Sequence, residues 1–249
     1  SLGASHTDRL ESRNPVKTLT FFGVQPGDTV LEALPGGGWY SKVLLPYLGD
    51  DGHLVGVDYA PDMWQYFGGF ATEEFIAGRT QWPQTWPTEA AAWNAKGAQI
   101  SAYTFASLPA DMTGKVDSVL FIRALHNMAR FEDKGGFLSK ALAETYRVLK
   151  PGGVVGVVQH AMAEDKPDSW ADGSRGYLKR SAVEKAFKDA GFEWVASTNI
   201  NANPKDDPQD GDTVWRLPPS LQVPEEQKAA SLAIGETNRM TLLFRKPVQ

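Results

Sequence analysis

The chain has 249 residues, of which 42% are hydrophobic and 22% are charged, and its formal net charge is -5. This composition is typical of a globular protein with a buried core, and the negative charge disfavours a nucleic-acid-binding surface. The absence of cysteine excludes disulfides and thiolate chemistry, and the four histidines show no metal-site spacing, so we expect no metal. No apolar run reaches the roughly 18 residues that a membrane-spanning helix needs.

The first patterned segment lies before residue 28. We expect residues 1–14 to be polar and loosely helical. Asn14 followed by Pro15 predicts the start of a short helix with Asn14 as its N-cap, and Gly23 predicts its end.

A glycine turn follows the first predicted strand. Thr29–Ala33 is a short apolar run typical of a buried strand, with Glu32 near its end. Pro35 then ends the strand, three consecutive glycines follow, and a helical pattern begins at Trp39. Glycines let the backbone approach a ligand and the helix start supplies free N–H groups, so the layout predicts a nucleotide site. An ordinary tight turn is the alternative interpretation.

An acid closes the second predicted strand, His53–Val57. The helical pattern at residues 40–47 connects the two strands, so we expect a parallel βαβ unit. Asp58 is suited to bind the two hydroxyls of a ribose, because a carboxylate offers two acceptors to two donors. The alternative is that Asp58 caps a helix before Pro61. The nearby glycine turn favours the ribose role.

Residues 59–98 interrupt the alternation of strands and helices. This inserted segment is too long for a plain connection, and we expect it to hold a helix or two with irregular cover. Its tryptophans form either an apolar lid over the substrate or, as we favour, the core of the inserted segment. They are Trp64, Trp82, Trp86 and Trp93.

The second half of the chain supplies the remaining strands. A capping box at Ser181 and Glu184 predicts the start of the last regular helix, and residues 199–236 predict a long loop or lid. We therefore expect an α/β fold in a single domain, residues 1–249, with helices on both faces of a doubly wound, mostly parallel seven-stranded sheet whose last strand is antiparallel. The later strands are predicted at Gln99–Thr104, Val116–Ile122, Val154–Gln159, Phe192–Ser197 and Met240–Phe244.

Glu32 bears on the kind of nucleotide that the turn would bind. A carboxylate just before the glycines would repel a pyrophosphate, whereas it would attract a cationic ligand. The turn therefore favours a nucleoside that carries positive charge over a nicotinamide dinucleotide.

Several motifs together resemble the class I S-adenosylmethionine-dependent methyltransferases. They are Val30-Leu31-Glu32 with the glycine triplet, Val57-Asp58, and Leu149-Lys150-Pro151-Gly152-Gly153 before the fifth strand. The resemblance covers nearly the whole chain, and the stretches at residues 13–15, 21–23, 35–40 and 203–207 are similar to one bacterial branch of predicted methyltransferases. One departure is Leu34, which stands where the family's turn often has its first glycine.

The resemblance implies a role for each motif. The glycine turn would hold the methionine half of S-adenosylmethionine, with Glu32 near its amino group, which the backbone at Arg123 would also reach. Asp58 would bind the ribose, Tyr59 would flank the adenine, and the residues after the third strand would line the adenine pocket. The implied cofactor-binding residues are Glu32, Gly36, Gly37, Gly38, Asp58, Tyr59, Phe105, Ala106 and Arg123.

Two histidines are candidate catalytic bases. His126 follows the fourth strand and His160 ends the fifth, so we expect both to open towards the substrate. The alternative for each is a loop histidine that bonds to the backbone. Trp39 and Tyr40 are candidate substrate residues that would wall the sulfonium by cation–π contact, and packing of the first helix on the sheet is the alternative.

The chain is therefore predicted to be an enzyme that transfers a methyl group from S-adenosylmethionine to a small molecule, with no nucleic-acid partner and no membrane span. The alternatives are a non-catalytic ligand-binding or scaffold protein on the same fold, and a nicotinamide-dependent oxidoreductase. Arg79 and Arg216 are candidates for an anionic group, although we expect each to be a solvated surface side chain. The chain begins at Ser1 and lacks cysteine. A cytoplasmic location is favoured, and an exported one stays open because the chain does not start at Met and has no cysteine.

Overall fold

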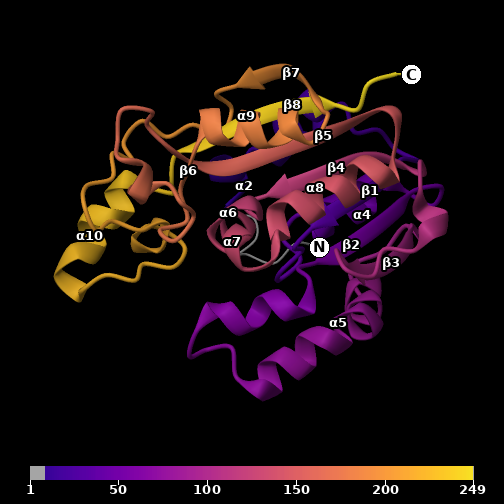
Figure 1. Ribbon diagram of the computed structural model, residues 1–249, viewed down its shortest axis with the longest axis horizontal. Helices are drawn as coiled ribbons and strands as arrows, with labels where there is room; N and C mark the ends of the chain where they lie inside the picture. Colours follow the sequence, from indigo (N-terminus) through magenta and orange to yellow (C-terminus); the bar gives the residue numbers. More distant parts are fainter. Residues whose placement is uncertain (1–8, 249) are drawn as a thin grey trace.

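The computed structural model describes residues 9–248, which form a layered α/β fold around a central sheet (Figure 1). The long strands run in the order β3-β2-β1-β4-β5-β8-β7, and a short strand, β6, pairs with the end of β5. Strands β1 to β5 are parallel, whereas β8 runs antiparallel to both β5 and β7. The predicted fold class is confirmed.

The strands are β1 (Thr29–Ala33), β2 (His53–Asp58), β3 (Gln99–Thr104), β4 (Val116–Ile122), β5 (Leu149–Met162), β6 (Leu178–Lys179), β7 (Glu193–Thr198) and β8 (Arg239–Arg245). The α-helices are α2 (Leu10–Arg13), α3 (Pro15–Phe22), α4 (Ser41–Leu48), α5 (Glu73–Ala91), α6 (Leu125–Arg130), α7 (Glu132–Gly135), α8 (Phe137–Val148), α9 (Arg180–Asp189) and α10 (Glu225–Ile234). The described residues also form four short 3-10 helices, η1 (Pro61–Phe67), η2 (Ala110–Met112), η3 (Asp168–Trp170) and η4 (Val214–Arg216). The structure adds β6 to the predicted strands and extends β5 in both directions.

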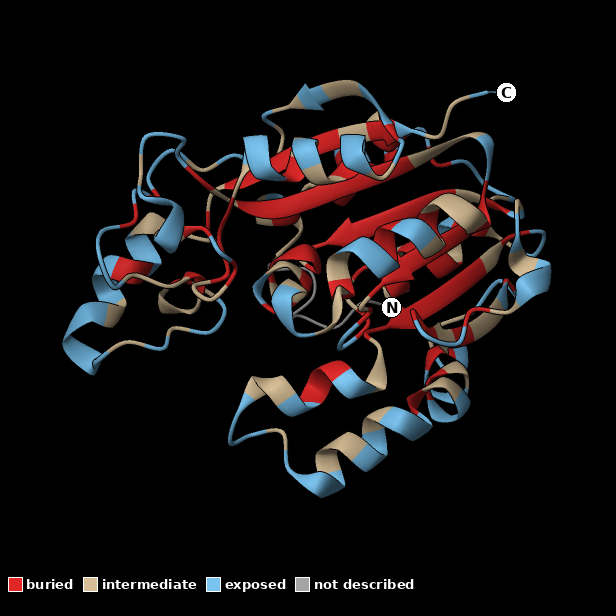
Figure 2. Ribbon diagram, in the orientation of Figure 1, coloured by how far each residue is buried: buried red, intermediate tan, exposed pale blue. Residues whose placement is uncertain are grey.

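Helices cover both faces of the sheet, and each face buries its own apolar core (Figure 2). On one face α6, α8 and α9 supply Leu125, Phe137 and Phe187. On the other face α3, α4 and the second half of α5 supply a further set, Phe22, Leu44 and Trp86 among them. The division follows from the period of two in a strand, which sends successive side chains to opposite faces.

The tryptophan-rich segment forms η1 and the 19-residue helix α5. Figure 1 shows this segment extending away from the sheet before the chain returns at β3. Trp82 and Trp86 are buried in the core of one sheet face, and Trp64 in the core of the other. These three are core residues and Trp93 packs partly buried against the same core as Trp86, but the favoured prediction is wrong about which core, because they join that of the sheet and not one of the inserted segment. Pro83 and Pro87, which each remove a backbone donor, lie within α5.

The last helices differ in detail from expectation. Within residues 199–236 the chain forms η4 and α10, which lie beyond the ends of β5 and β6 (Figure 1). The predicted capping box is wrong, because Ser181 lies inside α9 and its hydroxyl donates to Glu164 at 2.6 Å. Glu184 instead pairs with Arg180.

The helical start at Asn14 is right, but the side chain does not cap it. Asn14 has left-handed backbone (φ 42°), and its amide donates to the carbonyl of Ile200 at 3.0 Å. Of the predicted helical region at residues 1–14, residues 1–8 lie outside the described residues, and α2 covers Leu10–Arg13.

Candidate functional site

The strand order reverses between β1 and β4, which places the candidate site at the carboxyl ends of these strands. A non-glycine residue with left-handed backbone follows each strand, Leu34 (φ 53°) after β1 and Arg123 (φ 60°) after β4. Their N–H groups donate to the carbonyls of Val57 and Val158, both at 2.7 Å. Such residues cost about 1 kcal/mol or more and concentrate at functional sites.

The three glycines of the turn have different surroundings. A Cβ on Gly37 would meet no atom within 4 Å, and on Gly36 it would meet only the carbonyl of Leu34, at 3.9 Å. A Cβ on Gly38 (φ 72°) would clash with the ring of Trp93. Gly38 therefore admits a packed tryptophan, whereas Gly36 and Gly37 leave space for a ligand to reach the backbone.

Glu32 lies on the side of β1 that α4 covers. Its carboxylate is buried, and the hydroxyl of Ser41 donates to its Oε2 at 2.6 Å. Burial raises the pKa of Glu32 to about 7, even though the bond from Ser41 lowers it. The carboxyl group thus titrates near neutral pH, and a cation bound beside it would favour the ionised form.

Asp58 ends β2 as predicted, but its side chain has a cationic partner within the chain. The buried Oδ2 accepts hydrogen bonds from Nε of Arg79, at 2.8 Å, and from Nη2 of the same side chain. Arg79 belongs to α5, and its guanidinium lies 5.1 Å and 5.3 Å from the ring centroids of Trp64 and Trp82. Burial raises the pKa of Asp58, whereas the charge of Arg79 lowers it.

The expectation of solvated surface arginines is wrong for both Arg79 and Arg216. Arg216, in η4, pairs with the buried Asp206 at 2.7 Å. The hydroxyl of Tyr177 donates to the same carboxylate at 3.1 Å. Each arginine neutralises a buried carboxylate, which would be costly to leave unpaired.

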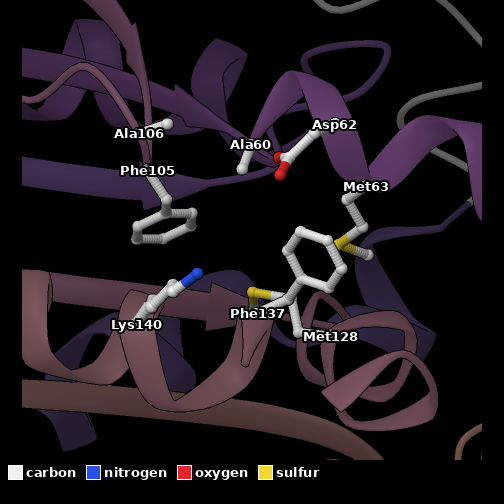
Figure 3. A pocket seen from close by; sticks show the side chains of 8 residues that line it. All are labelled: Ala60, Asp62, Met63, Phe105, Ala106, Met128, Phe137 and Lys140. Carbon is white, nitrogen blue, oxygen red and sulfur yellow. The ribbon is translucent and has the colours of Figure 1, made fainter. Parts of the chain in front are cut away.

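A hollow of about 100 Å³ lies beside the ends of β2 and β3 (Figure 3). Phe105 and Ala106, the predicted adenine residues, line it, and Lys140 points into it from α8. Asp62 of η1 adds a carboxylate. Sequence analysis did not identify Asp62 or Lys140, because nothing local marks residues of two distant helices as neighbours. Small-molecule pockets usually measure roughly 300–1,000 Å³, so the hollow is too small for a whole nucleoside in this conformation.

The aromatic residues beside the site are packed and hydrogen-bonded. The hydroxyl of Tyr59 donates to the carbonyl of Ala124 at 2.8 Å, and that of Tyr40 to the carbonyl of Arg13 at 3.2 Å. The ring of Trp39 lies 4.5 Å from the guanidinium carbon of Arg13. These contacts favour the packing interpretation of Tyr40, and they show that Trp39 already faces a cation of the chain itself.

The structure brings the two candidate histidines together. The rings of His126 and His160 are 5.7 Å apart, and Nδ1 of His160 lies 2.6 Å from the hydroxyl of Thr237. Burial, helped by the charge of Arg123, lowers the pKa of His126 to about 4, even though a hydrogen bond with Gln159 raises it. Burial and His126 hold the pKa of His160 well below its usual value. Both rings are therefore neutral at pH 7 and able to accept a proton, although as weak bases.

An arginine cluster, Arg9, Arg13, Arg123 and Arg239, gathers around one carboxylate beside the histidines. Glu236 Oε1 lies 2.8 Å from Nε of Arg9 and 3.8 Å from Nε of Arg13, and Arg239 pairs with the other oxygen. Burial lowers the pKa of Arg13 to about 8, and the charge of Arg123 contributes to the lowering. Sequence analysis assigned a role only to the backbone at Arg123 and none to these side chains, which three separate segments bring together.

Residues 9–248 contain no group of three or more histidine, aspartate or glutamate side chains that could hold a metal ion. Within the same range, none of the helices combines the length and apolar character that crossing a membrane requires.

Solved structures with this fold include enzymes of different activity, all below 25% identity to this chain. The cyclase SpnF superposes with a TM-score of 0.57 at 17% identity, over 96% of this chain and 81% of its own. A SAM-dependent methyltransferase from Aquifex aeolicus gives 0.53 at 21%, over 78% and 87%. The 1,6-didemethyltoxoflavin-N1-methyltransferase of Burkholderia thailandensis, with bound S-adenosylhomocysteine, gives 0.52 at 14%, over 98% and 81%. These likenesses show the fold, and no curated protein matches the sequence.

The family comparison is more specific. A family model described as a methyltransferase domain matches residues 31–157, just over half of the chain. The matched region runs from β1 into β5 and includes the glycine turn, Asp58 and Arg123. This match confirms the recognised family and supports the predicted cofactor, S-adenosylmethionine. With the strand order, the switch-point turn and the acid of β2 all in place, the chain belongs to the methyltransferase domain family.

Proposed function

We propose that this protein transfers a methyl group from S-adenosylmethionine to a small-molecule acceptor. The observation that carries the proposal is the row of groups along the carboxyl edge of the sheet. Asp58 ends β2, a glycine turn with open backbone follows β1, and the left-handed Arg123 follows β4. Asp58 offers acceptors for the ribose hydroxyls, and the turn lets the charged methionine half approach the backbone. The two lie side by side at the point where the strand order reverses.

Arg79 is the best indication that Asp58 suits a ribose. Nε and Nη2 of its guanidinium both donate to Oδ2, so the carboxylate accepts two neighbouring donors, as two ribose hydroxyls would supply. A ribose can take this place only when Arg79 leaves. Arg79 is 20% exposed, which gives its guanidinium a route to solvent.

The other cofactor residues fit the two ends of the same ligand. Gly36 and Gly37 leave room for the methionine half, with Glu32 close by as an acceptor for its amino group. The hollow at Phe105 and Ala106 suits the adenine. When bound, S-adenosylmethionine supplies an electrophilic methyl group on its sulfonium. The residues of the chain bind it, orient it and exclude water.

His126 and His160 are the candidate bases at the acceptor end. Both rings are neutral at pH 7, so either can take a proton from the acceptor. Their low pKa values suit an acceptor whose nucleophile needs little help to lose its proton.

Calorimetric titration of the whole chain with S-adenosylmethionine and S-adenosylhomocysteine tests the proposal. We expect both to bind, since they share the adenosine and the amino acid. If neither binds at millimolar concentration, the proposal is wrong.

A non-catalytic ligand-binding or scaffold protein is the second candidate. The ion pair between Arg79 and Asp58 favours it, because it closes the ribose position, and so does the small hollow. The likeness to a cyclase is also compatible with a role other than methyl transfer on this fold. This candidate predicts no binding of either adenosyl compound, so the same titration separates the two.

A further inference from the structure

The arginine cluster lies where the proposed function places the methyl acceptor. We propose that the cluster binds an oxyanion, a carboxylate or a phosphate, carried by that acceptor. The inference rests on the proposed function, because it names the substrate class of the same site.

The order of the strands gives the cluster its position. Along the carboxyl edge of the sheet, Asp58 ends β2, the glycine turn follows β1, Arg123 follows β4, and His160 lies in β5. Because β8 runs antiparallel, its first residue also lies at this edge, and Arg239 is the register partner of His160. The cluster and the ribose acid are therefore on opposite sides of the glycine turn. An acceptor held at the cluster would face a methyl donor held at the turn.

The charges of the cluster do not balance. Among residues 9–248, three of the four arginines (Arg9, Arg13 and Arg239) pair with one carboxylate, that of Glu236, and Arg123 adds a further positive charge beside them. Residues 1–8 contain a single carboxylate side chain, Asp8, so even its arrival would leave positive charge in excess. Unpaired buried charge is costly, and proteins usually supply a counter-charge. The missing counter-charge here is negative.

The cluster also has hydrogen-bond donors to spare. Arg13 is 3% exposed, yet neither its Nε nor its Nη1 has a hydrogen-bond partner among the described residues. Arg123 forms no ion pair within the same range. Each free N–H of a guanidinium can donate a charge-assisted hydrogen bond to an oxygen of a carboxylate or a phosphate. An oxyanion would satisfy both the charge and the donors.

A cavity of about 230 Å³ reaches one arginine of the cluster, Arg239, and its lining includes the acidic residues Glu11 and Glu236. Glu236, Thr237 and Arg239 line it, together with Asn201, whose buried Oδ1 has no partner among residues 9–248. The hydroxyl of Thr237 also contacts His160, so the wall of the cavity continues to the histidine pair. The polar lining suits a polar ligand and gives it a way in.

The test measures anion binding and cofactor binding separately on the full chain. Inorganic phosphate and malonate are titrated at constant ionic strength, with Tm and calorimetry as readouts, and S-adenosylhomocysteine is titrated in parallel. Arg13→Gln removes donors of the cluster. Arg180→Gln is the matched control, since Arg180 pairs with Glu184 on the surface of α9. Arg239→Gln serves as a second variant if Arg13→Gln fails to fold.

We expect phosphate or malonate to raise the Tm of the wild type and of Arg180→Gln. Arg13→Gln should weaken anion binding about tenfold or more, as the loss of a charge-assisted hydrogen bond predicts, and leave S-adenosylhomocysteine binding unchanged. No anion effect on the wild type, or an equal effect on Arg13→Gln, overturns the inference.

The cofactor has a carboxylate of its own, which supplies a further arm. If Arg13→Gln weakens binding of S-adenosylhomocysteine but not of its decarboxylated analogue, the cluster holds the cofactor and the inference is overturned. If the wild type does not bind S-adenosylhomocysteine at all, the proposed function fails. If it binds the cofactor but no anion, only the present inference fails.

Discussion

The two ends of the candidate site treat buried charge in opposite ways. At the end of β2, Asp58 is buried and paired with Arg79, so the charges balance. Beside β4 and β8, the arginine cluster has only Glu236 as a partner among the described residues. A buried charge is stable only when it is paired. At the end of β2, Arg79 occupies the place on Asp58 that the ribose would take, whereas the arginine cluster lacks a counter-charge. To bind the cofactor, Asp58 must exchange Arg79 for the ribose, whereas the arginine cluster must gain an anion.

Removing the acid from the balanced end should have the largest effect. Asp58→Ala should weaken cofactor binding by about 3 kcal/mol, or roughly 100-fold, because two hydrogen bonds to a charged acceptor are lost. Calorimetry with S-adenosylhomocysteine measures it. Asp58→Asn keeps the size of the side chain, and Asp189→Ala, which removes an exposed carboxylate of α9, is the control. An unchanged affinity in Asp58→Ala would remove the ribose role.

Glu32 offers a comparison across pH. Its pKa is about 7 in the folded protein and 4.5 in the unfolded chain, so between these values the folded state alone holds the proton. The free energy of unfolding should therefore fall as pH rises from about 4.5 to 7, by about 3 kcal/mol, and stay constant above. Urea unfolding at pH 5 and pH 8 measures it, and Glu32→Gln should remove this contribution. A wild-type stability that is equal at both pH values would contradict the buried acid.

A cationic ligand beside Glu32 should be bound more tightly as pH rises through 7. Calorimetry in buffers of different ionisation enthalpy should show proton release on binding of S-adenosylmethionine at pH 6, and none in Glu32→Gln.

Substitutions at Gly37 and Gly38 should distinguish the packing role of the turn from its binding role. Gly38→Ala should cost about 2 kcal/mol of stability, because the residue has left-handed backbone and its Cβ would meet Trp93. Gly37→Ala meets no atom and should leave the Tm unchanged while weakening cofactor binding. Thermal unfolding and calorimetry on both variants decide it. Equal Tm losses would show that the turn has one structural role only.

Removing Arg79, the partner of Asp58, should have the smallest effect on cofactor binding. Arg79→Ala removes the internal partner of Asp58, so the ribose no longer has to displace it and cofactor binding should tighten by about 1 kcal/mol. The gain is smaller than the free energy of the ion pair, because water solvates Asp58 once Arg79 is gone. The Tm should fall in the same variant, since α5 loses its ion pair with the end of β2. Weaker cofactor binding in Arg79→Ala would mean that Arg79 contacts the ligand and does not exclude it.

The fold was predictable because its signals are local. Apolar runs, the glycine turn and the acid after β2 each lie within a few residues, and the structure places them at the switch point as expected. The capping box failed because Glu164, distant in the sequence, takes the hydroxyl of Ser181. The partner of Asp58 and the whole arginine cluster were missed for a similar reason, since Arg9 and Arg239 meet only through the folded chain.

Helix α5 has a consequence for kinetics. Arg79 of this helix pairs with Asp58, and Trp93, just after the end of the helix, packs on Gly38 of the glycine turn. The segment therefore contacts both the proposed ribose position and the proposed methionine position. Pro83 has no N–H to donate to the carbonyl of Arg79, four residues earlier, which weakens the helix where it must open. On the proposed function, uptake of the cofactor waits for this segment to move. The observed rate of cofactor association should then level off at high cofactor concentration, and the plateau should equal the rate at which the helix opens.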